Sequence, residues 1–311
     1  MRFAYGFALA CAAGLAALPV ALAQYRLGVV YNQTIQPFGG WFRDGVMRVA
    51  LDALLVGGAV AVILWLVERS RQWWVYSLLG VFLVGLFVGF VEPVVVAPLF
   101  NRYRPLGPQH ALTASIRALE RKAGIAAPIL VADSSRQSEL PSTRVAGYGA
   151  TARIVIGDTL MARRTPGEVL FAVARDFAHF KRNDTLRTTF MWTFFFAVAV
   201  AAAVVIAEHV RFRRDDDPLS RLALIAALAG AVGLVMYPLY NGYSRHIERR
   251  ADEYALALTD DPASAVRTFV RLADRRFVEV CAPRWVVVYF YMAPALGTRI
   301  AVATGKHDLC R

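Results

Sequence analysis

The stretch Thr188–Ala207 decides the fold; it reads TTFMWTFFFAVAVAAAVVIA and contains no charged residue. A helix of about 20 apolar residues crosses the roughly 30 Å hydrocarbon core of a bilayer, so this stretch predicts a transmembrane helix. Three other stretches have similar length and character: Val49–Val67, Trp73–Val91 and Leu222–Tyr240. The sequence therefore predicts a mainly α, polytopic helical membrane protein.

The composition agrees with a bilayer environment. Hydrophobic residues make up 57% of the chain and charged residues only 19%, which is too apolar for an ordinary soluble domain. The formal net charge of +12 could attract nucleic acid, but the arginines cluster beside the apolar stretches, where anionic headgroups lie. Because the sequence also contains no nucleic-acid-binding motif, we expect membrane lipids as partners and no nucleic acid.

The first residues allow two interpretations. Arg2, the apolar stretch Phe3–Leu22 and the small-residue triplet Ala21–Ala23 have the layout of a secretory signal. An uncleaved first membrane helix would read almost the same. Residues 1–23 are thus a signal peptide or a first transmembrane helix, and residues 24–100 form a membrane region with two transmembrane helices.

Residues 188–240 are predicted to form a transmembrane hairpin, because only a short charged turn separates the two apolar stretches. This turn contains Arg211, Arg213, Arg214 and Asp215–Asp217. The chain then returns to the side that it left. Residues 101–187 and 241–311 would therefore share one compartment and could build one site.

The segment 101–187 has the pattern of a small mixed domain. A helical pattern of apolar residues ends at Gly124, and a second helix begins at Pro166. Between them, Ile129–Ala132 and Arg153–Ile156 are predicted to be short strands.

Two segments carry candidate functional side chains. Arg175 and His179 are four positions apart in one predicted helix, and Glu248 and Asp252 are four apart in another, so each pair shares a helix face. Taken alone, His179 would be an ordinary polar residue, and Glu248 would belong to a solvated charged face.

These segments belong to a longer ordered series of motifs. The series comprises Ala97–Leu106 (APLFNRYRPL), Val131–Ser138 (VADSSRQS), Gly147–Gly149 (GYG), Ile154–Leu160 (IVIGDTL) and Pro294–Ile300. It resembles the membrane zinc metalloendopeptidases of the CAAX-processing family and, more distantly, the bacterial heat-shock membrane proteases of the same superfamily. The resemblance implies an inserted gluzincin-like metallopeptidase domain with a small β-sheet, a zinc cofactor, and peptide or membrane-protein substrates.

The resemblance also assigns roles by position. His179 would be the second zinc histidine, Glu248 the third ligand, and Asp252 a carboxylate that orients a ligand imidazole. The HExxH motif, however, reads Arg175-Asp-Phe-Ala-His179, so that Arg175 replaces the first histidine and Asp176 stands at the position of the general-base glutamate.

Two further departures concern the substrate groove and the end of the domain. Ser142 and Thr143 replace an Asn-Ala pair in the family's substrate strand, which would form a groove together with Gly147 and Gly149. Ala293 replaces a histidine that precedes the late proline in the family pattern.

Arg175 is the decisive departure, because a guanidinium stays protonated, has no lone pair to donate and repels a dication. His179 and Glu248, with or without Asp176, fall short of the three protein ligands that catalytic zinc uses, so zinc should be weakly bound or absent. We hypothesise that the Arg175 guanidinium takes the place of the metal among Glu248, Asp252 and Asp176.

Three functions follow from these observations. The first is a catalytically impaired relative of the membrane metallopeptidases that binds polypeptides; the second is an active zinc endopeptidase with an altered ligand set; the third is a non-catalytic scaffold.

Cys11, Cys281 and Cys310 show no metal-ligand spacing, and nothing in the sequence supports a Cys281–Cys310 bridge. The turns near Arg69 and Arg211 favour a domain on the periplasmic side of a bacterial-type inner membrane, although the domain itself is rich in arginine.

Overall fold

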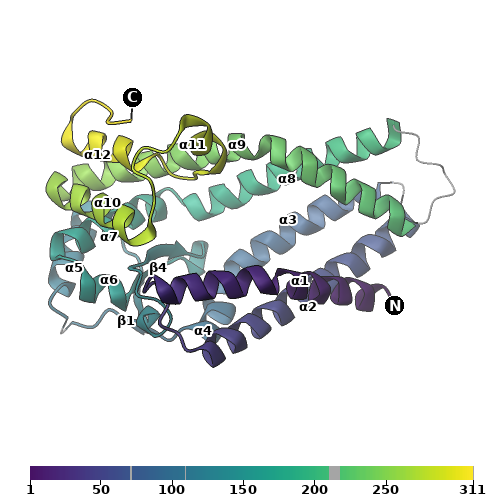
Figure 1. Ribbon diagram of the computed structural model, residues 1–311, viewed down its shortest axis with the longest axis horizontal. Coiled ribbons are helices and arrows are strands. Elements are labelled where there is room, and N and C mark those ends of the chain that lie inside the picture. The colour runs from purple at the N-terminus through teal and green to yellow at the C-terminus, as the bar shows by residue number, and fades with distance from the viewer. Residues whose placement is uncertain (71, 109, 210–217, 311) are drawn as a thin grey trace. The chain divides into compact units, whose positions relative to one another are not determined.

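The computed structural model describes residues 1–311 apart from 71, 109, 210–217 and 311 (Figure 1). The chain divides into two compact units: Met1–Phe87 with Trp192–Met236, and Val88–Met191 with Tyr237–Arg311. The charged turn expected at residues 211–217 lies outside the described residues. Among the described residues, five helices are long and apolar enough to cross a membrane.

The first unit consists of long apolar helices. It contains α1 (Arg2–Val30), α2 (Phe38–Arg69), most of α3 (Trp73–Val91) and of α8 (Asp184–His209), and the first part of α9 (Pro218–Thr259). Helices α1 and α2 pack as an antiparallel pair. Their close approach requires glycine, because a Cβ at Gly6 would lie 2.7 Å from Cβ of Val60 and one at Gly57 would lie 2.9 Å from the ring of Phe3.

The helices of the first unit extend beyond the apolar stretches predicted from hydropathy. Helix α8 begins at Asp184, and α9 continues well past Tyr240 to Thr259. Helix α9 continues through Pro238 and ends before Asp260, which has a positive φ of 52°, and Pro262. Hydropathy marks where an apolar surface ends and does not mark where a helix ends.

The second unit combines a four-stranded mixed sheet with helices. The strands are β1 (Tyr103–Pro105), β2 (Ile129–Ala132), β3 (Thr143–Ala146) and β4 (Arg153–Gly157), in the order β1-β2-β4-β3. Strand β4 pairs parallel to β2 and antiparallel to β3, with Thr143 opposite Ile156. The two predicted strands, β2 and β4, are confirmed, whereas β1 and β3 were not predicted, because three or four residues at a sheet edge leave little sequence signal.

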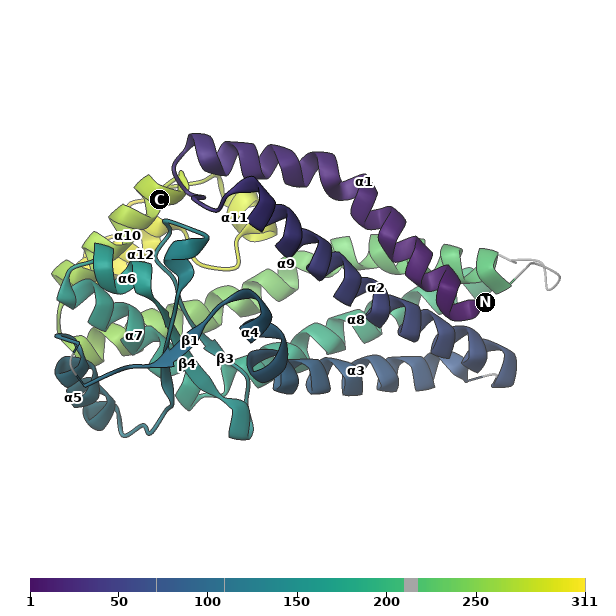
Figure 2. The same ribbon diagram turned by 90° about the horizontal axis from the view of Figure 1, so that it is seen from below.

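Helices surround this sheet (Figures 1 and 2). They comprise α4 (Ala97–Phe100), α5 (Thr113–Ala123), α6 (Asp158–Arg163), α7 (Pro166–Lys181), α10 (Pro262–Arg276), α11 (Arg284–Phe290) and α12 (Leu296–Thr304). As predicted, Gly124 ends α5 in the left-handed conformation and Pro166 begins α7. Helix α7 contacts β3, β4, α5 and α10, and its buried face, with Phe171 and Phe177, is the centre of the hydrophobic core.

A disulfide joins Cys281, between α10 and α11, to Cys310 after α12. This bridge has no signal in the sequence, because the cysteine spacing matches no known motif; in the structure, both sulfur atoms lie against Gly297 of α12. The third cysteine, Cys11 in α1, is free.

Candidate functional site

The candidate site lies where three helices of the second unit meet. Helix α7 begins with a capping box in which the side chains of Thr165 and Glu168 satisfy the first backbone N–H groups. Arg175 and His179 lie four positions apart on one face of α7. Glu248 and Asp252 likewise share one face of α9. Helix α12 adds Arg299, which is only 6% exposed.

Arg175 joins α7 to α9 through two carboxylates. Its Nε donates a hydrogen bond of 2.6 Å to Oδ1 of Asp252, and its Nη2 donates to Oε2 of Glu248 in an ion pair. Burial alone would lower the pKa of Arg175, but the charges of Asp252 and Glu248 raise it above its ordinary value. The guanidinium is therefore a permanent cation that contacts both acidic residues, as the sequence hypothesis required.

Asp252 also binds a second guanidinium. Arg299 donates from Nε to Oδ2 over 2.7 Å and from Nη2 to Oδ1 over 2.8 Å. The Arg299 guanidinium lies 4.3 Å from the ring centroid of Phe269, so an aromatic face covers its other side. One buried carboxylate thus connects α7, α9 and α12.

His179 lies at the edge of the same cluster. Its Nδ1 is 2.9 Å from Oδ2 of Asp184, the first residue of α8, and its Nε2 is 3.7 Å from Oε1 of Glu248. Asp184 fixes the orientation of the imidazole and also pairs with Arg182 at 3.3 Å. The two residual ligand positions, His179 and Glu248, are therefore adjacent, with Arg175 bound to the same Glu248 carboxylate.

Asp176 points to the sheet and not to the Arg175 cluster. Its Oδ2 accepts a hydrogen bond from Oγ1 of Thr143 on β3, and the side chain is buried. Burial raises the pKa of Asp176 to about 6, although the Thr143 hydrogen bond and the charge of His179 act in the opposite direction. Of the expected contacts of Arg175, those with Glu248 and Asp252 are hydrogen-bonded ion pairs, whereas Asp176 contributes only through its charge.

The residues expected to form a substrate groove follow the edge of the sheet. Ser142 is exposed and its carbonyl oxygen accepts from the N–H of Gly157 at 2.8 Å, while Thr143 begins the edge strand β3. Gly147 and Gly149 follow β3 with positive φ values of 72° and 58°. A Cβ at Gly147 would lie 2.6 Å from the carbonyl oxygen of Thr151, so this turn requires glycine.

Two members of the cluster received no role from the sequence. Arg299 belongs to the late motif Pro294–Ile300 without a predicted role, and Asp184 lies outside the motifs. The signal for Arg299 is a single arginine in an otherwise apolar helical turn, which needs a buried acid as a partner. Asp184 has the position of a helix-starting residue, so its bond to His179 could not be separated from an ordinary capping role.

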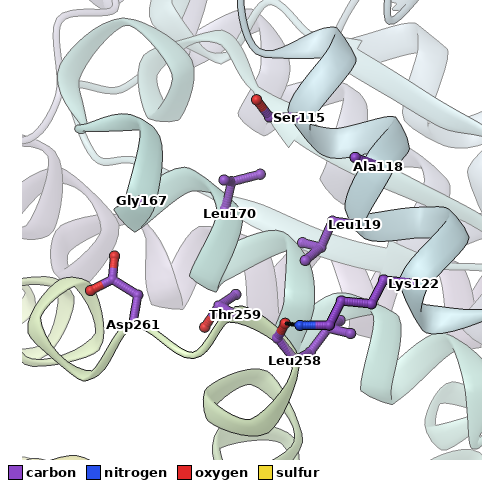
Figure 3. Close-up of a pocket in the computed structure, with 9 residues that line it drawn as sticks. All are labelled: Ser115, Ala118, Leu119, Lys122, Gly167, Leu170, Leu258, Thr259 and Asp261. Atoms are coloured by element: carbon purple, nitrogen blue, oxygen red, sulfur yellow. Dashed lines mark hydrogen bonds between the residues drawn. The ribbon is translucent and has the colours of Figure 1, made fainter.

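A separate pocket of about 360 Å³ lies beside the N-terminal part of α7 (Figure 3). Its wall includes Lys122 of α5, whose Nζ donates a hydrogen bond of 2.6 Å to the carbonyl oxygen of Leu258. The lining residues are Ser115, Ala118, Leu119, Lys122, Gly167, Leu170, Leu258, Thr259 and Asp261. None of the site residues predicted from the sequence lines this pocket.

The residues of the cluster do not fit a catalytic zinc ion. Arg175 contacts Glu248 where a dication would have to bind, and the His179 imidazole is the one nitrogen ligand of the predicted set that remains beside it. Within the described part of the chain, no three His, Cys, Asp or Glu side chains are grouped so that they could hold a metal ion.

Comparison with known proteins adds two family matches. Residues 108–306 match the model of peptidase family M48, and residues 2–102 match the model described as CAAX prenyl protease N-terminal, five membrane helices. The chain is 27% identical to the uncharacterized metalloprotease YhfN of Bacillus subtilis over 97% of this chain and 73% of that protein. It is 26% identical to a CAAX prenyl protease 1 homolog of Oryza sativa over 87% of this chain and 64% of that protein.

A solved structure shares the fold. The crystal structure of S. mikatae Ste24p superposes with a TM-score of 0.80 at 21% sequence identity, covering 96% of this chain and 74% of that chain. The chain thus spans about three quarters of this structure, and 64% of the length of the rice homolog.

Proposed function

Since the chain belongs to peptidase family M48 and is a multi-pass membrane protein, we propose that it is a catalytically impaired member that binds polypeptides without cleaving them. The observation that carries this proposal is the Arg175 guanidinium, which is hydrogen-bonded to Glu248 and Asp252. M48 members are generally zinc-dependent, so that the replacement of a zinc ligand by a permanent cation would remove the family's chemistry.

The loss would affect both binding and reactivity. A zinc ion beside Glu248 would meet the positive charge of Arg175 at contact distance, and it would gain one imidazole, that of His179, in return. Asp176, whose shorter side chain already accepts a hydrogen bond from Thr143, would be poorly placed as a general base. The charge of Arg175 instead compensates Glu248 and Asp252, which preserves the packing of α7 on α9.

Polypeptide binding is supported by the exposed edge of the sheet. Strand β3 is the last strand in the order β1-β2-β4-β3, and its outer backbone groups can pair with an extended peptide. The side chains of Ser142 and Arg144 are exposed beside this edge. A peptide bound there would lie next to α7 through the contact between Thr143 and Asp176.

The decisive test combines metal analysis with proteolysis. Full-length protein purified in detergent should contain far less than one zinc per chain and should not cleave an unfolded protein substrate in a chelator-sensitive way. The double variant Arg175→His/Asp176→Glu restores the HExxH pattern and should gain zinc. Arg249→His, which places a histidine at an exposed arginine of α9, is the matched control and should bind no zinc.

Stoichiometric zinc and chelator-sensitive cleavage by the wild-type protein would overturn the proposal in favour of an active enzyme with an altered ligand set. A photo-crosslinker at Ser142 would distinguish polypeptide binding from a purely structural role. Crosslinks to polypeptide would support binding, and their absence across a library of extended peptides would favour a scaffold.

We also infer that residues 1–23 stay in the mature protein. Helix α1 runs without interruption from Arg2 to Val30, past the expected cleavage point at Ala23, and packs on α2 through Gly6 and Gly57. The match to the family's membrane region also begins at residue 2. The intact mass of the purified protein tests this inference, since cleavage would remove the first part of α1.

A further inference from the structure

Helix α11 carries an exposed apolar patch outside the candidate site. The patch consists of Trp285, Val288 and Phe290 of α11 and Met292 just after it, and we call it the α11 patch. Trp285 is 68% exposed and Phe290 57%, and the centroids of their rings lie 6.3 Å apart. The other residues of Arg284–Phe290 are also exposed or half-buried, so α11 lies on the surface of the second unit. Apolar surface patches of this kind mark places that bind another molecule or a membrane.

Two consecutive turns of α9 hold the C-terminal part of α11, which lies beside α9 in both views (Figures 1 and 2). The side chain of Asn241 donates a hydrogen bond to the carbonyl oxygen of Tyr289. Nη1 of Arg245 donates hydrogen bonds of 2.8 Å to the carbonyl oxygens of Val287 and Tyr291. Carbonyl groups at a helix end lack partners within the helix, and in a bilayer such groups have no water to bind. The two α9 side chains therefore supply what α11 needs in a membrane environment.

These contacts lie where the apolar stretch of α9 ends. Leu222–Tyr240 is the part of α9 predicted to span the membrane, and Asn241 is the next residue. Leu239 is 61% exposed, as a side chain that faces lipid would be. Tyr237, whose ring centroid is 6.2 Å from that of Tyr289, is of the residue type found at membrane–water interfaces. Helix α11 is thus attached to α9 at the boundary between hydrocarbon and headgroups.

The charges around this boundary suit a lipid surface. Residues 241–250 of α9 contain three arginines and one acidic residue, Glu248, whose carboxylate already pairs with Arg175. Residues 282–292 contain one charged residue, the exposed Arg284. Interfacial helices combine Trp and Phe on the inserted face with basic residues at the level of the headgroups, where anionic lipids attract them. Both segments have this composition.

A protein partner is the competing cover for the α11 patch. A stable protein interface buries roughly 800 Å² on each partner, and one aromatic side chain supplies at most about 250 Å². Two partly exposed aromatic rings with one valine and one methionine fall short of that area. The patch also adjoins the end of a membrane helix that exposes Leu239, so lipid can cover both surfaces without interruption.

We propose that α11 is an interfacial helix whose apolar patch inserts into the bilayer beside the end of the α9 span. Hydropathy does not single out α11, because seven helical residues are far too few to cross a membrane. The chain continues from Met292 into α12, which supplies Arg299 to the Arg175 cluster, so the inserted helix also ties the candidate site to the lipid surface. The proposal rests on α9 and α11 and does not depend on whether the protein cleaves peptides.

Fluorescence quenching in a bilayer tests the proposal. A fluorescent amino acid replaces Val288 in the full-length protein, which is reconstituted in nanodiscs of phosphatidylcholine and phosphatidylglycerol with or without bromine near the top of the acyl chains. The matched control carries the fluorophore at Val270 of α10, which is 44% exposed against 49% for Val288. Interfacial helices lie about 5–10 Å into the headgroup and acyl boundary, so brominated lipid should remove about half of the emission at position 288 and leave that at position 270 unchanged.

Acrylamide in the aqueous phase should give the opposite order, with stronger quenching at position 270. Quenching of position 288 by acrylamide and not by brominated lipid would overturn the proposal, because the α11 patch would then face water. Protection of position 288 from both quenchers would also overturn it, since a protein segment or a second copy of the chain would then cover the patch. Equal quenching of both positions by brominated lipid would place α11 no closer to lipid than α10 and count against it.

Trp285 provides a second measurement that introduces no bulky probe. The difference in emission between the wild-type protein and Trp285→Phe isolates this residue from the other five of the six tryptophans. Brominated lipid should reduce this difference by about half, for the same reason of depth. If the difference is the same in both lipids, the proposal fails even where the Val288 variant does not fold. Zinc in the wild-type protein would overturn the proposed function without changing the quenching, so the two proposals fail separately.

Discussion

Replacing Arg175 with methionine should destabilise the second unit, because it removes the cation shared by Glu248 and Asp252. Breaking a buried ion pair by removing one partner costs about 3–5 kcal/mol. Here the Arg175 and Glu248 side chains are 22% and 27% exposed, and Asp252 keeps Arg299, so we expect the lower cost of about 2–3 kcal/mol.

For a unit of this size, 1 kcal/mol shifts Tm by about 2–4 °C, which predicts a decrease of about 4–12 °C for Arg175→Met. Thermal unfolding of the detergent-purified protein measures it. The matched control is Arg249→Met, which removes an arginine on α9 whose ion pair with Glu253 is 54% exposed at both ends. This control should change stability by less than about 0.5 kcal/mol.

A double-mutant cycle isolates the pair. Glu248→Gln alone should be destabilising, but Arg175→Met/Glu248→Gln should lose less than the sum of the single variants by about 1–2 kcal/mol. If Arg175→Met leaves Tm unchanged, or if the two substitutions are additive, the guanidinium does not compensate the carboxylates and the argument from Arg175 is refuted.

Three other perturbations test separate features. Burial raises the pKa of Asp176 to about 6, above the roughly 3.9 of an unfolded chain, so the folded protein binds this proton more tightly. Its stability should therefore fall by up to about 3 kcal/mol as the pH rises from about 4 to 6. Asp176→Asn should remove this loss. If the Tm of the wild-type protein and that of the variant changed equally with pH across this range, the prediction would be wrong. Gly147→Ala should lower the free energy of unfolding by about 1–3 kcal/mol because of the positive φ of 72° and the close carbonyl oxygen of Thr151. Gly149→Ala, where a Cβ meets nothing within 4 Å, should lower it less. Equal losses in chemical denaturation would argue against the steric reason. Cys281→Ser/Cys310→Ser removes a bond between two residues that are 29 positions apart, and it should lower stability by about 3–4 kcal/mol. An unchanged Tm under non-reducing conditions would show that the bridge does not stabilise the second unit.

Much of the fold could be predicted because its signals are local. Apolar stretches indicated the membrane helices, Gly124 and Pro166 marked the ends of two helices, and β2 carries a run of apolar residues. The predicted transmembrane hairpin implied that residues before and after it could build one site, and Arg175 contacts Glu248 and Asp252 in the structure. Each of these features depends on residues close together in sequence or on one count of membrane crossings.

The missing features depend on tertiary packing. The edge strands β1 and β3 are too short for a period to show, and their positions are set by β2 and β4. The disulfide requires the course of α11 and α12 to be known. The hypothesis drawn from the sequence also included Asp176 among the carboxylates around Arg175, but the Asp176 carboxylate accepts its hydrogen bond from Thr143 on β3.

The double engagement of Asp252 gives the cluster an uneven tolerance to change. Loss of either arginine would leave this acid with one cation still bound, whereas loss of Asp252 itself would remove the carboxylate that accepts two hydrogen bonds from the buried Arg299 guanidinium and would leave Arg175 with Glu248. Among random substitutions in this cluster, those at position 252 should therefore be the rarest survivors, whether or not the protein cleaves peptide bonds.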